Sequence, residues 1–160
     1  MIRPEIMLRA CAVAALVALV LACGPMGPIP GGRLRGTVVE PSPTEWSHVE
    51  AERTVQLETR PDDPHSINIW TGVVDGRLYI ASSLIRGPDE PEERDWVQHV
   101  LADPRVRLRV DGRIYELKAT RVEDPALVET VREAMIAKYD VKPDAHSSAA
   151  WVFRLEPREG

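Results

Sequence analysis

Alternation of apolar and polar residues predicts several β-strands along this chain. Residues 54–59 alternate with a period of two, which is typical of a strand that is buried on one face. Trp151, Phe153 and Leu155 alternate in the same way near the C-terminus. A further strand is expected over residues 34–39, where it meets a proline-containing break.

Two Asp-Gly pairs predict β-hairpins. Asp and Gly tolerate the positive φ angles that a two-residue turn between antiparallel strands requires. Each pair stands between two runs rich in β-branched and other apolar residues. The first hairpin is expected over residues 67–74, Asp75-Gly76 and 77–82, and the second over 106–110, Asp111-Gly112 and 113–122.

A helix is expected between the two hairpins. Pro91 suits a first helical turn, with Asp89 or Glu90 as the cap, and the pair Asp103-Pro104 ends the helix. Acidic residues at its start face the positive end of the helix dipole. The apolar face of this helix is predicted to comprise Trp96, Val97, Val100 and Leu101.

A second helix is expected to begin at Asp124-Pro125. The order of elements is therefore strands, helix, strands, helix and a last strand. Two hairpins and a lone closing strand favour an antiparallel sheet or small barrel over a parallel α/β sheet. The inner side of the second helix is predicted to carry Leu127, Val128, Val131, Met135 and Ile136.

The N-terminus has the pattern of a bacterial lipoprotein signal. Arg3 and Arg9 precede an apolar run over residues 10–22, which ends in a small residue directly before Cys23. Cleavage there would make Cys23 the acylated (palmitate-bearing) first residue, held at the bilayer by its acyl chains. The alternative is an ordinary cleaved signal peptide with an incidental cysteine. We expect a lipoprotein signal peptide over residues 1–22, a Pro/Gly tether over 23–33 and a folded domain over 34–160.

Location and charge narrow the classes of function. The lipoprotein interpretation places the protein in the bacterial cell envelope, on the periplasmic side, with the outer membrane mildly preferred. The net charge of −5 argues against a general nucleic-acid surface. Both cysteines, Cys11 and Cys23, lie in or next to the leader, so thiol catalysis and cysteine-based zinc sites are excluded from the domain. The four histidines lack metal-like spacing, and no metal site is predicted.

The chain resembles the pyridoxamine 5′-phosphate oxidase-like split-barrel family, including its flavin and deazaflavin nitroreductase branch. The resemblance extends roughly from Thr54 to Leu155. It implies a mainly β fold with two helices, an antiparallel six-stranded split β-barrel of the FMN-binding type that forms a homodimer. It is carried by the first hairpin (residues 66–70 and 75–83), the Trp-bearing helix and its exit (96–106), and the second hairpin (112–115) with Ala119 and Asp124.

The resemblance also implies a cofactor site for FMN or a deazaflavin. Hydroxyl groups and a guanidinium suit a flavin phosphate, while an apolar wall suits the ring. The loop after the first hairpin carries acidic residues that oppose phosphate binding. Carried over residue by residue, the cofactor contacts would be Ser66, Asn68, Trp70, Ser82, Ser83 and Arg86.

Each of these residues also has a structural interpretation. The serines can cap backbone groups at a strand end, Arg86 can pair with a nearby acid, and Trp70 can anchor the core. Asn68 can face solvent. His65, in the loop that enters the first hairpin, could donate a proton to a reduced cofactor ring or simply titrate in water.

Three functions remain open. The leading hypothesis is an exported, lipid-anchored oxidoreductase-like protein that reduces a small organic acceptor through a flavin or deazaflavin, with no catalytic side chain identified. The second is a non-catalytic split-barrel lipoprotein that binds a hydrophobic or tetrapyrrole ligand. The third is a structural envelope lipoprotein.

Overall fold

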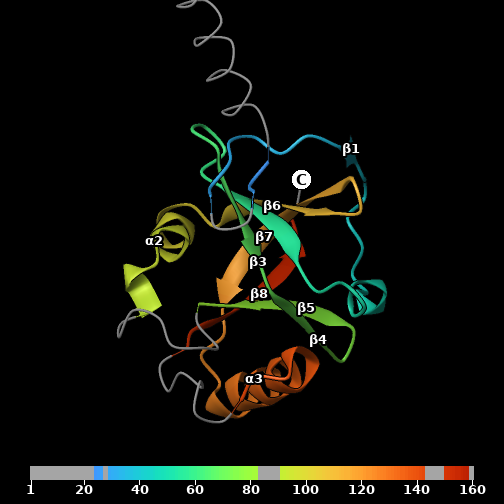
Figure 1. The fold of residues 1–160 in the computed structure, drawn as a ribbon, viewed down its shortest axis with the longest axis vertical. Coiled ribbons are helices and arrows are strands. Elements are labelled where there is room, and N and C mark those ends of the chain that lie inside the picture. The colour runs from blue at the N-terminus through green and yellow to red at the C-terminus, as the bar shows by residue number, and fades with distance from the viewer. Residues whose placement is uncertain (1–23, 27–28, 83–90, 143–149, 159–160) are drawn as a thin grey trace, which may run out of the picture.

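The computed structural model describes residues 24–26, 29–82, 91–142 and 150–158, and its centre is one curled β-sheet (Figure 1). The strand order is β3-β2-β6-β7-β8-β5-β4, and every pairing along this path is antiparallel. The strands are β2 (Val55–Thr59), β3 (His65–Ile69), β4 (Thr71–Val74), β5 (Arg77–Ala81), β6 (Arg105–Val110), β7 (Arg113–Arg121) and β8 (Val152–Pro157).

The two edges of this sheet, β3 and β4, are consecutive in the chain and separated only by Trp70. The prediction of one uninterrupted strand over residues 67–74 was therefore wrong. At Trp70 the chain passes from one edge to the other, and the indole stacks on the Tyr139 ring with centroids 4.2 Å apart. Counted as one interrupted run, β3 and β4 complete the six long strands expected of a split barrel, and the mainly β fold with two helices is confirmed.

Both hairpins form at the predicted Asp-Gly pairs. Asp75 and Gly76 have φ angles of 50° and 71°, and Asp111 and Gly112 have φ angles of 46° and 73°. Two successive positive φ angles match the right-handed twist of the flanking strands. The local sequence therefore fixes both turns.

The strand expected over residues 34–39 is much shorter than predicted. Only β1 (Thr37–Val38) forms, and it pairs with β7 in the parallel direction. The N–H of Leu34 instead donates to the Glu58 carboxylate at 2.6 Å, which takes that residue out of any strand ladder.

The first helix, α2 (Asp95–Ala102), begins later than expected. Pro91–Glu93 forms only a single 3₁₀ turn (η2), and Arg94 is extended, with φ −75° and ψ 121°. The proposed caps Asp89 and Glu90 lie outside the described residues. Leu101 is exposed, because it lies about 40° beyond Val97 on the helix and outside the buried arc of Trp96, Val97 and Val100.

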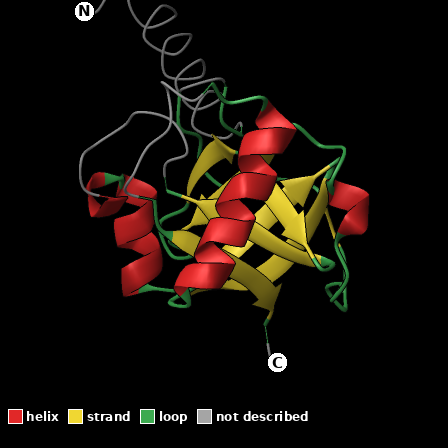
Figure 2. Ribbon diagram, turned by 90° about the horizontal axis from the view of Figure 1, so that it is seen from below, coloured by secondary structure: helices red, strands yellow, loops and turns green. Residues whose placement is uncertain are grey.

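The second helix, α3 (Pro125–Tyr139), begins as predicted, with the Asp124 carboxylate accepting the Ala126 N–H at 3.0 Å. It lies across the strands in Figure 2. Its buried face is Val131, Met135 and Tyr139, while Leu127 and Val128 are only partly buried and pack beside it.

Alternation along β5 divides the core into two clusters. Leu78 and Ile80 point into the barrel, where they join the main cluster with residues such as Leu57, Leu108 and Trp96. Tyr79 points the other way, into a smaller cluster under α3. The barrel interior is filled by side chains, so a ligand site must lie on its outer surface or rim.

Candidate functional site: a groove on the outer face of the sheet

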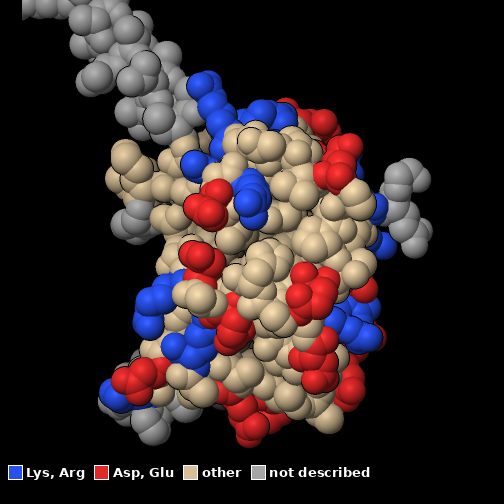
Figure 3. All heavy atoms as spheres, turned by 90° about the vertical axis from the view of Figure 1, so that its right-hand side faces the viewer, with Lys and Arg blue, Asp and Glu red and all other residues tan. Residues whose placement is uncertain are grey.

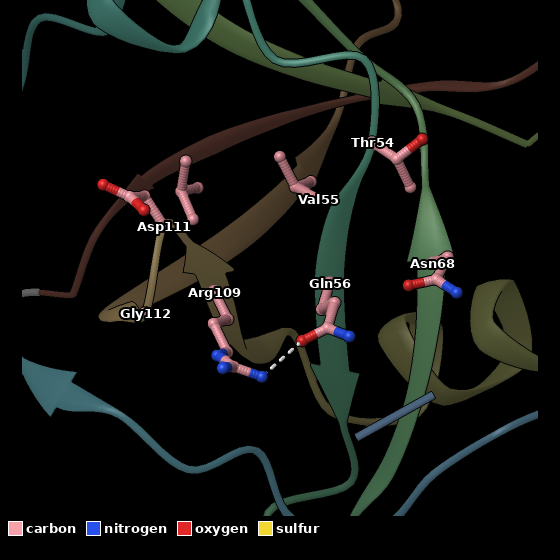
Figure 4. A pocket seen from close by; sticks show the side chains of 8 residues that line it. Thr54, Val55, Gln56, Asn68, Arg109, Asp111 and Gly112 are labelled. Atoms are coloured by element: carbon pink, nitrogen blue, oxygen red, sulfur yellow. Dashed lines mark hydrogen bonds between the residues drawn. The ribbon is translucent and has the colours of Figure 1, made fainter. Parts of the chain in front are cut away.

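A groove of about 410 Å³ opens on the outer face of β2, β3 and β6. The sheet register places Gln56 opposite both Asn68 and Arg109, so these three side chains lie side by side on one face. The neighbours Leu57 and Leu108 point to the opposite face and are fully buried. The lining residues are Thr54, Val55, Gln56, Asn68, Arg109, Val110, Asp111 and Gly112 (Figure 4).

The floor of the groove is polar. Arg109 Nη1 donates to Gln56 Oε1 at 2.9 Å, drawn as the dashed line in Figure 4, and Asn68 stands beside Gln56 on the next strand. Arg109 Nε is buried and has no hydrogen-bond partner among the described residues. That atom is closed off from the groove, but the guanidinium has further N–H groups that can donate to an acceptor group there. The floor therefore suits a ligand that carries carbonyl, carboxylate or phosphate oxygens.

A buried ion pair lies one step further along the same strands. Glu58 is 1% exposed, and its Oε2 accepts from Arg107 Nη1 at 3.0 Å. Arg107 Nε also lies 3.5 Å from the Glu116 carboxylate. This pair organises the sheet beside the groove.

The described part of the segment over residues 23–33, expected to be a tether, contacts this face. Gly31 pairs with Ser66 through two backbone hydrogen bonds of 2.8 Å, and Leu34 is buried. Gln56 Nε2 donates to the Pro25 carbonyl at 3.4 Å. We call residues 24–26 and 29–36 the N-terminal strap; it borders the groove at Gln56.

The predicted cofactor residues do not gather at one place. Asn68 lines the groove. Ser66 is on the same strand, but it is fully buried beneath the strap, and its Oγ donates to the Gly32 carbonyl at 2.7 Å. Trp70 packs against Tyr139 of α3. Ser82 is buried, and its Oγ accepts the Trp151 N–H at 2.9 Å. Ser83 and Arg86 lie outside the described residues.

Two histidines that are far apart in sequence meet at the end of β2. His65 lies in β3 rather than in a loop, and its ring meets that of His99 edge to face, with centroids 5.1 Å apart. His99 Nδ1 is 2.9 Å from Thr59 Oγ1. Burial lowers the pKa of both imidazoles, and the nearby Arg60 lowers these pKa values further. In the described ranges, no three His, Cys, Asp or Glu side chains are grouped as metal ligands would be.

Gln56 and Arg109 were missed by sequence reasoning. The available signal was alternation, because Gln56 and Arg109 are the polar positions of strands whose next residues are apolar. Alternation alone marks such residues as outward-facing. Their convergence depends on the pairing of β2 with β6, which the sequence does not reveal.

The curled antiparallel sheet with α2 and α3 defines the class of protein by its fold as a split barrel. Residues 57–152 match the family described as F420H(2)-dependent quinone reductase, so the chain belongs to that family. The resemblance found in the sequence is thereby confirmed. No curated protein matches the chain.

Solved structures share the fold. A conserved hypothetical protein from Mycobacterium tuberculosis is 22% identical, with a TM-score of 0.53 over 69% of this chain and 76% of its own. An F420-H2 dependent reductase (FDR-A) is 14% identical, with a TM-score of 0.51 over 66% and 95%. A protein described as a domain-swapped dimer is 15% identical, with a TM-score of 0.52 over 66% and 81%.

Proposed function

We propose that this chain is an exported, lipid-anchored reductase that uses a deazaflavin or flavin to reduce a small organic acceptor of the quinone class. The observation that carries the proposal is the match of residues 57–152 to a family of F420H(2)-dependent quinone reductases. The cofactor, when bound, supplies a hydride from its reduced ring. The protein contributes binding and orientation.

The groove fits such a cofactor. Its volume lies in the range of small-molecule sites, at about 300–1,000 Å³. The amides of Gln56 and Asn68 make the floor polar, as the edge of a flavin-type ring requires. Arg109 would hold a carbonyl or phosphate oxygen through the guanidinium N–H groups that do not bond to Gln56. Asp111 at the rim is exposed and adds one negative charge. Because this charge repels anions, that end of the groove suits the polar edge of the ring better than a group with several negative charges.

The lipid anchor and the dimer are further parts of this proposal. The leader over residues 1–22 and Cys23 support export and acylation. The domain-swapped dimer among the structural neighbours supports a homodimer. Ser83 and Arg86 stay predicted cofactor contacts, because they lie outside the described residues.

The test is uptake of cofactor by the detergent-solubilised full chain. We expect the protein to quench the fluorescence of F420 or FMN on binding and to oxidise the reduced cofactor when a quinone such as menadione is added. Protein that takes up neither cofactor would refute the proposal.

The groove is tested by Arg109→Ala. The loss of a charge-assisted hydrogen bond, about 1.5–3 kcal/mol, should weaken cofactor affinity roughly tenfold or more. Arg105→Ala on the same strand is the matched control, because Arg105 is exposed and pairs with Asp103 instead. Equal affinity for both variants would show that the cofactor binds elsewhere.

A further inference from the structure

The strap exposes two large apolar side chains to the outside. Met26 and Ile29 are 57% and 55% exposed, and Val38, just after the strap, is exposed too. These are three of the four large apolar side chains found exposed among the described residues; the fourth is Leu101 of α2. Of these, Met26 and Ile29 are close in sequence, and neighbouring exposed apolar side chains are typical of a contact surface.

Hydrogen bonds hold the backbone that carries these two side chains. Met26 and Ile29 exchange two backbone hydrogen bonds of 3.1 and 3.0 Å. Two residues after Ile29, Gly31 pairs with Ser66, and the buried Leu34 fixes the strap to the sheet. The exposure is therefore a property of the folded strap.

Met26 lies close along the chain to Cys23, the proposed site of acylation. Met26 follows Cys23 by three residues, which span at most about 11 Å when extended. The polar layer on each side of a bilayer is about 5–8 Å thick. A molecule held by acyl chains on Cys23 thus keeps Met26 within reach of the lipid interface.

We infer that Met26 and Ile29 insert into the interfacial layer of the bilayer and fix the orientation of the domain on the membrane. This inference rests on the lipid anchor of the proposed function. The occupant is a phospholipid surface, and the contact is apolar. Because the strap borders the groove at Gln56, the docked molecule holds the groove beside the membrane.

Charge plays a minor part in this contact. Arg33 and Arg35 of the strap are exposed, but Arg33 donates to the Pro61 carbonyl, next to the exposed Asp62 and Asp63. Figure 3 shows acidic and basic side chains interspersed over the face it draws. Docking is therefore expected to depend little on anionic lipid and on salt.

The experiment uses the full chain, acylated at Cys23, in vesicles of phosphatidylcholine with or without phosphatidylglycerol. Met26→Cys and Ile29→Cys are each labelled with nitrobenzoxadiazole. The label reacts only at the new cysteine, because Cys23 is acylated and Cys11 is removed with the leader. Ala137→Cys is the control, because it is exposed on α3, which lies at the opposite end of the molecule from the strap (Figure 1). We expect labels at 26 and 29 to be quenched by doxyl lipids, at high and low salt alike, and the label at 137 to be quenched only by aqueous iodide.

A second pair of variants tests the apolar contact. Met26→Asp should abolish doxyl quenching at position 29, whereas Leu101→Asp, which changes an equally exposed leucine on α2, should leave it intact. Iodide quenching at 26 and 29 equal to that at 137, in protein that sediments with the vesicles, would overturn the inference.

Failure of the anchor gives a different result. If the protein is found outside the membrane fraction and carries no acyl chain, the proposed lipidation is wrong. The labelled chain carrying Cys11→Ser and Cys23→Ser is then added to the same vesicles. A shift of the 26 and 29 emission to the blue supports docking, and no change overturns it.

Discussion

At the scale of single residues, the most consequential side chain is Glu58. It is 1% exposed, accepts the Leu34 N–H at 2.6 Å, and accepts from Arg107 at 3.0 Å. One carboxylate therefore joins the strap, β2 and β6. A buried charge of this kind is tolerated because each of its partners donates to it.

We predict that Glu58→Ala lowers the free energy of unfolding by about 3 kcal/mol. The substitution leaves Arg107 partly buried and short of one partner, although Glu116 still contacts it. Urea denaturation measures the change. Glu129→Ala is the control, since Glu129 of α3 is exposed and its loss should cost less than about 1 kcal/mol. Similar losses in both variants would contradict the role given to Glu58.

The residue scale is also where the sequence was least informative. Asn68 was predicted as a cofactor contact, and it does line a groove, but its neighbours Gln56 and Arg109 were not predicted. Gln56 and Arg109 are separated by 53 positions and meet only through strand pairing. Pairing register between distant strands depends on the whole sheet, so residue pairs of this kind escape local reasoning.

At the scale of elements, the hairpins were the most predictable parts and the helix start was not. An Asp-Gly pair determines its turn by local sterics, and both turns formed where expected. Asp89, Glu90 and Pro91 looked like a helix start by the same local rules. The extended backbone of Arg94 instead separates Pro91 from α2, which a propensity argument does not detect.

The contact between β4 and α3 depends on a residue without a side chain. A Cβ on Gly72 would lie 2.6 Å from Met135 Cγ. We predict that Gly72→Ala destabilises the protein by about 1–3 kcal/mol, because α3 must shift to make room. Urea denaturation in the wild-type and Met135→Ala backgrounds measures the effect. The cost should fall when Met135 is truncated, and an equal cost in both backgrounds would contradict steric conflict as the cause.

At the scale of the whole molecule, stability should depend on pH through the histidine pair. Burial lowers the pKa of His65 and His99 in the folded protein. The unfolded chain, with histidine pKa values near the ordinary value of about 6.5, then binds more protons than the folded one. Stability is therefore complete above that pH and declines as the pH falls toward the lowered values.

The measurement is the free energy of unfolding between about pH 7 and about pH 5.5, above the range where most carboxylates titrate. The wild-type protein should lose stability across this window, and His65→Gln with His99→Gln should lose less. An unchanged slope in the double variant would show that other groups cause the decline.

The overall architecture was largely predictable, because the order of elements and two firm hairpins leave few antiparallel topologies. The passage at Trp70 and the docking of the strap were not. Both result from contacts across the molecule, between Trp70 and Tyr139 and between Gly31 and Ser66. Within the described residues, neither α2 nor α3 has the length and apolar character that a membrane crossing requires.

Gly31 and Tyr139 also protect the two edges of the sheet. Gly31 occupies both backbone groups of Ser66 on β3, and the Tyr139 hydroxyl occupies both backbone groups of Thr71 on β4, at 2.9 and 3.0 Å. An unpaired edge strand is a template to which other chains can add strands and so aggregate. Blocking one position on each edge leaves a newly made molecule less able to recruit strands from its neighbours in a crowded compartment.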